Sequence, residues 1–498
     1  INRATVTVAL VLLQIGWLLW AFFSLTAGKV WVNAGLNVLS LFITLYLVRK
    51  DENSDYKIIW LVLIGMMPLL GGALYLAFGN KAPAKRMRQR MQAVERQHTA
   101  DLAQQPGQTD ALDPASRGLS RYVSEYGPYP AWKNSTAKYY PCGEAMYPDL
   151  LADLEKAERF IFLEFFIVRT GKMWKGVEDI LVRKAAQGVD VRVMYDGTCE
   201  FSTLPRDYPS RLEALGIQCK VFSPVTPFVS THYNYRDHRK ILVIDGRVGF
   251  TGGVNLADEY INHIEKYGRW KDSALMLEGE GVRSMTALFL QMWCILCQPE
   301  FEQFLRPEVP AARAEGFVVP YGDCPLDGER VGEMVYIDLL NRAKRYIHIM
   351  TPYLILDGEL ETALKFAAER GVDVHLILPH VPDKKFAYAL AKTHYKSLLD
   401  SGVKISEWLP GFVHAKVFVV DDSEAVVGTI NLDYRSLYHH FENAVWMKDT
   451  ACIPAIEKDF QKTLEFCRDV EPTRESIWEG KVLLHLAGIL LKVIAPLL

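Results

Sequence analysis

Three long stretches without a charged residue lie within the first 80 residues, at positions 4–28, 30–48 and 58–79. A helix rises about 1.5 Å per residue, so each stretch is long enough to cross a hydrocarbon core of about 30 Å. The first stretch also fits a cleaved signal peptide, and Pro68 with Gly71-Gly72 allows a kinked or re-entrant third segment. We predict a membrane region over residues 1–80 that contains two or three transmembrane helices.

Basic residues follow the third stretch: residues 81–96 hold six Lys and Arg against Glu95 alone. By the positive-inside rule this end is cytoplasmic, and such a cluster also attracts anionic lipid headgroups. The loop at 49–57 is basic as well, and if both loops are inside, the third stretch is not a simple span. Residues 97–117 are polar and aperiodic, so we predict a basic and polar linker over 81–117.

The remainder contains an internal repeat with an offset of about 180 residues and a conserved order. The matching segments are 154–161 with 340–347, 185–193 with 367–376, and 238–245 with 414–421. Each copy alternates helical segments with short apolar runs that fit strands, which indicates βαβ units. We therefore predict an α/β fold with two α/β/α repeats related by a pseudo-twofold axis, over residues 118–320 and 321–476.

The last segment, residues 477–498, is strongly apolar. Lys481, His485 and Lys492 are spaced by four and seven residues, which places them on one stripe of a helix. This pattern is typical of an amphipathic helix that lies on a membrane, and a terminal helix packed into the core is the alternative.

The strongest candidate chemistry is a motif that occurs once in each repeat. The first copy has His238, Lys240, Asp245, Gly252-Gly253 and Asn255, and the second has His414, Lys416, Asp421, Gly428-Thr429 and Asn431. Positions i and i+2 of a strand face the same side, so each His shares a face with its Lys. The Asp residues fall where each strand ends in turn chemistry, which favours a structural role for them.

Two copies of His, Lys and Asn suit substitution at a phosphodiester. One His attacks phosphorus and the other protonates the leaving oxygen, while Lys240, Lys416, Asn255 and Asn431 bind the phosphoryl oxygens. Such a site needs no metal and no cofactor, because the two Lys supply the positive charge. A His in this role needs an acid on its other nitrogen, and we expect Asp272 and Glu442 to be the orienting residues.

Composition and motif spacing argue against several other classes of function. The net charge of -3 does not favour a nucleic-acid binder, and eight Cys in 498 residues exclude a disulfide-rich scaffold. Cys294-x-x-Cys297 has no second ligand pair for zinc, so we expect buried helical thiols. For His439-His440 we expect surface or packing roles, with the mouth of the pocket as the alternative for one of them.

Two further groups of residues next to the first motif each allow more than one role. His232, Tyr233 and Asn234 precede it and are candidates for the pocket. Arg236 and Arg239 fit either headgroup phosphates or ion pairs.

These motifs resemble the phospholipase D superfamily and, more narrowly, the bacterial cardiolipin synthases, from about residue 35 to the C-terminus. The superfamily resemblance rests on the paired motif. The narrower one rests on segments 68–79, 234–241, 243–256, 351–353, 412–416 and 431–436. Thr429 departs from the Ser or Gly of many superfamily members, and it is small enough to be tolerated.

The resemblance implies a catalytic set of His238, Lys240, Asp245, His414, Lys416 and Asp421. It implies that two phosphatidylglycerol molecules give cardiolipin and glycerol through a phosphatidyl-histidine, at a bacterial cytoplasmic membrane. His238 would be the nucleophile and His414 the acid/base, although pseudo-symmetry also allows the reverse. We expect a multi-pass protein with a cytoplasmic catalytic domain, whose partners are these lipids and the bilayer and not nucleic acid.

Other functions stay open at this point. A membrane-anchored phospholipase D or nuclease would use the same chemistry with water as acceptor, and a lipid-binding scaffold would have lost part of one motif. The second lipid could be phosphatidylethanolamine. The oligomeric state, a homo-oligomer included, is not fixed by the sequence.

Overall fold

The computed structural model describes Gly16 and residues 30–50, 53–67, 71–72, 74–75, 85–98, 102–104, 107–224, 235–297, 302–305, 312 and 314–497. The chain forms two units. The smaller comprises residues 1–86, 225–234 and 493–498, and the larger comprises residues 87–224 and 235–492.

The smaller unit contains helices α2 (Val30–Arg49) and α3 (Ser54–Met66), whose side chains meet in a small core around Leu47, Trp60 and Ile64. Large apolar side chains of α2, such as Phe42, are exposed. No helix in the described part of the chain is both long enough and apolar enough to span a bilayer. Apart from Gly16, the first apolar stretch lies outside the described residues, as does about a third of the third stretch.

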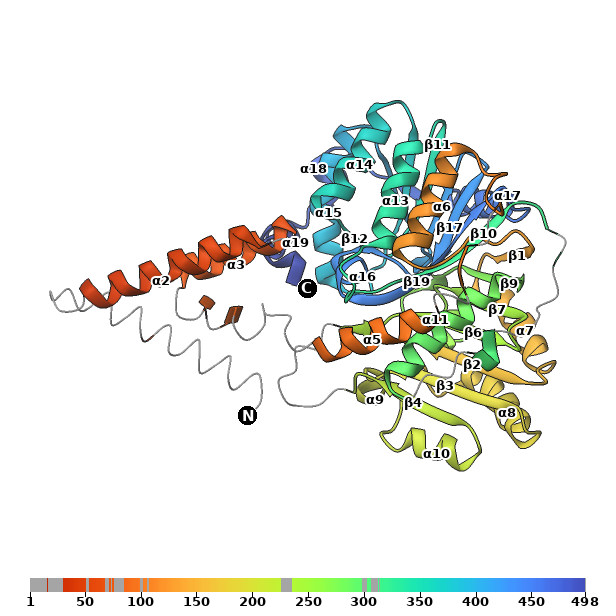
Figure 1. Ribbon diagram of the computed structural model, residues 1–498. Helices are drawn as coiled ribbons and strands as arrows, with labels where there is room; N and C mark the ends of the chain where they lie inside the picture. Colours follow the sequence, from red (N-terminus) through yellow and green to blue (C-terminus); the bar gives the residue numbers. More distant parts are fainter. Residues whose placement is uncertain are drawn as a thin grey trace. The chain divides into compact units, whose positions relative to one another are not determined.

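The larger unit is built on two sheets that share one strand order (Figure 1). The first sheet runs β1 (Ser135–Tyr140), β9 (Ala274–Gly279), β7 (Val248–Gly252), β6 (Lys240–Ile244), β2 (Phe160–Phe165), β3 (Asp190–Asp196), β4 (Gln218–Phe222). The second runs β10 (Phe317–Asp323), β19 (His440–Lys448), β17 (Glu424–Gly428), β16 (Val417–Val420), β11 (Tyr346–Met350), β13 (Asp373–Pro379), β14 (Lys404–Trp408), β20 (Cys467–Asp469).

Strand direction repeats as well as strand order. β2, β3 and β4 are parallel, as are β11, β13 and β14, and the strands from β6 or β16 onward are antiparallel in both sheets. The predicted α/β fold with a repeated domain is therefore confirmed. The second sheet begins at Phe317, a few residues before the predicted boundary at 320/321.

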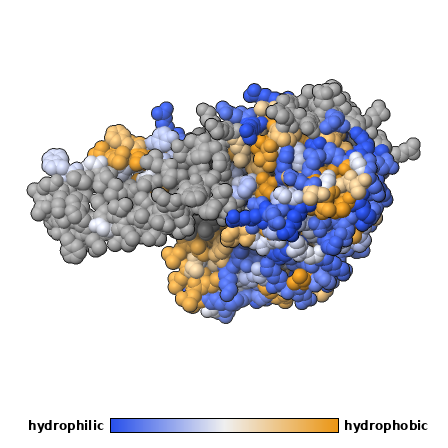
Figure 2. All heavy atoms as spheres, turned by 90° about the horizontal axis from the view of Figure 1, so that it is seen from below, coloured by the Kyte–Doolittle hydropathy of each residue, from blue (hydrophilic) through white to orange (hydrophobic). Residues whose placement is uncertain are grey.

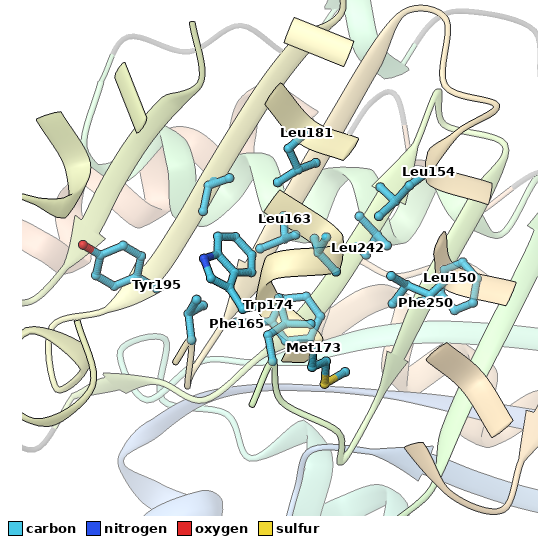
Figure 3. Close-up of a cluster of buried hydrophobic side chains, with 14 of the residues drawn as sticks. Leu150, Leu154, Leu163, Phe165, Met173, Trp174, Leu181, Tyr195, Leu242 and Phe250 are labelled. Atoms are coloured by element: carbon cyan, nitrogen blue, oxygen red, sulfur yellow. The ribbon is translucent and has the colours of Figure 1, made fainter. Parts of the chain in front are cut away.

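Helices alternate with the strands in both halves. In the first half they are α7 (Gly143–Leu154), α8 (Lys172–Ala186), α9 (Cys199–Ser202), α10 (Tyr208–Ala214), α11 (Val282–Ile295) and α12 (Glu302–Leu305). In the second they are α13 (Val331–Arg342), α14 (Gly358–Glu369), α15 (Lys385–Asp400), α16 (Tyr434–Tyr438), α17 (Ile453–Leu464), α18 (Arg474–Trp478) and α19 (Val482–Ile494). Figure 3 shows the first core, where Trp174 of α8 packs near Leu163 and Leu242 of the sheet.

The predicted linker is more ordered than its polarity suggests. Helix α5 (Lys85–His98) buries Met91 and Val94, which share one helical face at a spacing of three residues. Helix α6 (Pro114–Tyr126) begins inside the predicted linker, capped by the Asp113 side chain. Both helices form because a few apolar positions reach a neighbouring surface.

The two halves are joined by short parallel strand pairs. β5 (Arg236–Asp237) of the first half pairs with the start of β19 of the second. β8 (Arg269–Lys271) of the first half pairs with β15 (Gly411–Val413) of the second. Helix α11 also contacts both β6 and β10, and it is buried along nearly its whole length. The remaining pair is β12 (Leu354–Ile355) with β18 (Leu432–Asp433).

Candidate active site

The two short pairings between the halves bring the motif histidines to one place. His238 follows β5, and its backbone N–H donates to Phe441 O at 2.9 Å. His414 follows β15, and its backbone N–H donates to Lys271 O at 2.6 Å. Each histidine is therefore anchored to the opposite half, next to that half's downstream acid.

The acids pair with the histidines across the halves. Nδ1 of His238 lies 2.9 Å from Glu442 Oε2, and Nδ1 of His414 lies 2.8 Å from Asp272 Oδ2. All four side chains are buried. An acid that accepts a hydrogen bond from Nδ1–H leaves Nε2 of a neutral imidazole unprotonated, so Nε2 is the atom available for chemistry.

The two motif lysines lie within the same buried site. Nζ of Lys240 donates to the carbonyl oxygen of His238 at 2.6 Å, and Lys416 makes the equivalent bond to His414. Burial lowers the pKa of Lys240 to about 8 against the opposing charge of Glu442. Burial lowers the pKa of Lys416 to about 7, and the charge of Lys240 contributes to this shift. Two buried ammonium groups close together form a strong site for an anion.

Burial and neighbouring positive charge favour the neutral form of both histidines. Burial lowers the pKa of His238 well below its usual range, and the charges of Lys240 and the neighbouring histidines add to this. Burial and Lys416 lower the pKa of His414 to about 4, although Asp272 opposes the shift. A phosphate anion bound at the lysines would favour the protonated imidazole.

The two orienting acids differ in charge state. Burial acts to raise the pKa of Asp272, but His414, Lys416 and the backbone N–H of Ser273 outweigh it and lower that pKa. Burial raises the pKa of Glu442 well above its usual range, against the charge of Lys240 and the Thr429 hydroxyl. The site is thus symmetric in residues and asymmetric in electrostatics.

Gly253 and Thr429 occupy equivalent motif positions and explain part of this asymmetry. A Cβ atom on Gly253 would lie 1.9 Å from Asp272 Oδ1 and 3.0 Å from the His414 carbonyl, so the close approach requires glycine. Thr429 instead donates its hydroxyl to Glu442 Oε2. The sequence departure at Thr429 therefore supplies a hydrogen bond to the acid that orients His238.

The motif asparagines are held by protein groups. Asn255 Oδ1 accepts from the backbone N–H of Ile167 at 2.9 Å, and its Nδ2 donates to the Tyr260 hydroxyl at 2.8 Å. Asn431 Nδ2 donates to Ser436 Oγ at 3.0 Å, while its Oδ1 has no hydrogen-bond partner among the described residues. Each amide nitrogen keeps one further N–H for a ligand.

Asp245 and Asp421 lie at the far end of their strands from the lysines, which corrects their place in the catalytic set. The Asp245 carboxylate accepts from the backbone N–H groups of Glu158, Arg159 and Phe160. Asp421 makes the equivalent bonds to residues 344–346. Both have a positive φ, near 50°. They fix the turn after the strand, as their turn chemistry suggested.

His440 is a third histidine of the site, which agrees with the alternative that one of His439 and His440 lies at the pocket and differs from the surface or packing roles expected for both. Its ring centroid lies 5.4 Å from that of His238, and its Nδ1 lies 3.6 Å from Glu442 Oε1. Neither ring nitrogen has a hydrogen-bond partner among the described residues. One ligand atom from each of His238, His440 and Glu442 lies within 4.8 Å of the others, so these three could also converge on a cation.

The other candidates have structural positions. Arg239 is buried and donates Nε to the backbone oxygen of Glu442 at 3.1 Å, and Arg236 donates to Ser223 O at 2.8 Å. Cys294 is buried in α11 as expected, whereas Cys297 follows the helix end and is exposed. Residues 232–234 lie outside the described residues.

Comparison with known proteins assigns the family. The family described as "Cardiolipin synthase, PLD-like domain" matches residues 150–293 and 336–464, and "Phospholipase_D-nuclease N-terminal" matches residues 35–80. A cardiolipin synthase of Geobacillus kaustophilus is 33% identical over 509 residues, which cover 100% of both chains. The chain belongs to the cardiolipin synthase family of the phospholipase D superfamily.

Two further comparisons are consistent with this assignment, one in the length of the match and one in the fold. A Streptococcus mutans protein described only as uncharacterized is 51% identical over 462 residues, 91% of this chain and 99% of its own. The crystal structure of a phosphatidylserine synthase from Haemophilus influenzae matches with a TM-score of 0.59 at 15% identity, over 76% of this chain and 100% of that one. The second comparison supports the phospholipase D fold alone. The resemblance seen in the motifs is therefore confirmed, and this family member is an enzyme.

Proposed function

We propose that this enzyme condenses two phosphatidylglycerol molecules to cardiolipin and glycerol. The observation that carries the proposal is the crossed pairing of His238 with Glu442 and of His414 with Asp272 around two buried lysines. This arrangement offers two imidazole Nε2 atoms and an anion site in one place, which in-line substitution at phosphorus requires.

In the first step, Nε2 of His238 attacks phosphorus of the first lipid. The N–P bond forms, the bond from phosphorus to the glycerol headgroup breaks, and His414 gives its Nε2 proton to the departing glycerol oxygen. Lys240 and Lys416 stabilise the charge on the equatorial oxygens. Asp272 stabilises the imidazolium form of His414 that this step needs, because it is the ionised acid of the two.

In the second step, a terminal glycerol hydroxyl of the second lipid attacks the phosphatidyl-histidine. Neutral His414 takes the hydroxyl proton, the new P–O bond forms, and the P–N bond to His238 breaks. Cardiolipin leaves, and both histidines return to their starting protonation states. Burial of both imidazoles limits the access of water, which favours a lipid alcohol over hydrolysis.

We infer that the enzyme works on a cytoplasmic membrane, as a multi-pass protein with a cytoplasmic catalytic domain. The match of residues 35–80 to the N-terminal family region and the basic residues of 81–96 support this. Helix α19 supports it separately. Its His485 packs on Trp478, while Leu483, Leu486, Ile489 and Leu490 are exposed, so an apolar face is free to enter a membrane surface.

The test is lipid mass spectrometry after incubation of the purified full chain with phosphatidylglycerol. Cardiolipin with an equal amount of free glycerol is expected, and phosphatidic acid as the main product would contradict the proposal in favour of hydrolysis. Phosphatidylethanolamine added as acceptor tests the second lipid. The exposed His263→Ala variant is the matched control for His238→Ala, because both remove one imidazole.

A further inference from the structure

A cavity of about 640 Å³ opens beside the active site, within the larger unit. Its walls come from the end of β1, from β8, from the loop between β14 and β15, and from α17. None of the motif residues lines it. Its volume falls within the range of sites for small organic ligands.

The floor of the cavity is aromatic. Trp270 and Trp408 are only 7% and 5% exposed and line it together with Tyr139, while Phe466, just after the end of α17, is 54% exposed and lines it as well. Figure 2 shows that the visible surface is mainly hydrophilic, with apolar side chains gathered in patches. An alkyl chain placed on these rings would remove apolar surface from water, at about 25 cal/mol per Å².

The cavity also carries an excess of positive charge. Four cations line it, Arg269, Lys271, Lys458 and Lys462, against the single acid Asp459. Asp459 is already engaged, because its Oδ2 accepts from Lys271 Nζ at 2.7 Å and from the Tyr139 hydroxyl at 2.6 Å. Within the described residues, the other three cations form no ion pair.

The wall between the cavity and the active site is one residue thick. Trp270 lines the cavity, and its Nε1 donates to Asp272 Oδ2 at 3.2 Å. Its ring centroid lies 5.3 Å from that of His414. A ligand on Trp270 would therefore touch the residue that holds the orienting acid of His414.

We propose that this cavity binds an amphipathic phosphate ester, such as an anionic phospholipid, at a site separate from the catalytic one. The phosphate contacts Arg269, Lys458 and Lys462, and the chain packs on Trp408 and Phe466. Aromatic rings alone would suit any apolar ligand, and exposed cations alone would suit any anion. Their combination around one cavity selects a molecule with both parts.

Equilibrium binding of n-decyl phosphate to the full chain, in a background of neutral detergent, tests this proposal. The Lys458→Gln/Lys462→Gln double variant is expected to weaken binding about tenfold or more, because it removes two cations at the headgroup. Phe466→Ala is expected to weaken it severalfold. All three side chains are exposed, so the fold should tolerate the changes.

The controls separate this site from the micelle and from the active site. Lys133→Gln/Lys344→Gln removes the same charge from exposed positions elsewhere and is expected to leave binding unchanged. His238→Ala is expected to leave it unchanged too. Equal binding to both double-lysine variants would overturn the proposal, and so would equal affinity for inorganic phosphate. Because binding is measured without turnover, this outcome is independent of the proposed reaction.

Discussion

The two histidines of the site share a motif but sit in different surroundings. His414 pairs with Asp272, whose pKa is lowered and which also accepts from Trp270 Nε1. His238 pairs with Glu442, whose pKa is raised by burial, and it has His440 beside it. An ionised acid stabilises an imidazolium, so His414 suits acid/base work, and neutral His238 suits attack. Duplication supplied two equivalent sets of His, Lys and Asn, and we propose that the residues next to each His distinguish the roles of the two histidines.

Removing either imidazole is expected to have the largest effect on activity. We expect His238→Ala and His414→Ala each to lower cardiolipin formation by about 10⁴-fold or more, because one loses the nucleophile and the other the proton transfer. Turnover on lipid vesicles is the measurement. Near-normal activity in either variant would mean that the two halves do not share one site.

The acids should respond unequally when each is replaced by its amide. Asp272→Asn is expected to lower kcat by about 10²- to 10³-fold, since it removes a negative charge that His414 needs. Glu442→Gln is expected to cost about tenfold, because burial raises the pKa of Glu442 and disfavours its charged form, so the amide removes less negative charge than it does at Asp272. Equal losses in the two variants would refute the electrostatic asymmetry.

Position 253 and its equivalent, position 429, should also respond unequally to alanine. Gly253→Ala forces a methyl group against Asp272 Oδ1, so we expect about a 100-fold loss of activity from a displaced acid. Thr429→Ala introduces no clash and removes a methyl group and the hydroxyl that bonds Glu442 and the Asn443 backbone, so a loss of a few-fold is expected. A melting temperature for each variant shows whether the loss comes from unfolding instead.

The lysines set the alkaline limb of the pH profile. An amine binds phosphate strongly only when protonated, and the pKa values are about 8 for Lys240 and about 7 for Lys416. We therefore expect kcat/KM to fall by about tenfold or more as the pH rises from 7.5 to 9, because loss of the Lys240 proton alone accounts for about tenfold and loss of the Lys416 proton adds to it. A profile that stays flat to pH 9 would show that the lysines keep their protons.

Metal removal should have the smallest effect. We expect EDTA to leave turnover unchanged, because the lysines provide the positive charge in the proposed steps. The experiment also tests whether His238, His440 and Glu442 bind a cation, since their ligand atoms lie within 4.8 Å of one another. Loss of activity with EDTA, restored by a divalent cation, would assign that cluster a metal.

The repeat was enough to predict an α/β fold with a repeated domain, and to single out the two His/Lys pairs as candidates, because helix and strand periodicity and side-chain alternation are local patterns. The crossing of the acids could not be predicted. It depends on pairings of only two or three residues, between positions 204 residues apart for His238–Glu442 and 142 apart for His414–Asp272. The place of His440 in the site could be given only as an alternative for a similar reason, since only the tertiary fold places the start of β19 beside His238. Helix α5 within the predicted polar linker could not be predicted either, because it depends on the burial of Met91 and Val94.

Trapping the covalent intermediate tests the central claim most directly. The full chain is mixed with phosphatidylglycerol labelled in its phosphate, quenched within milliseconds, and digested for mass spectrometry. We predict a phosphatidyl group on the imidazole of His238 that passes into cardiolipin when unlabelled phosphatidylglycerol is added. Label on His414 would reverse the roles, and label on neither histidine, with cardiolipin still formed, would contradict the account.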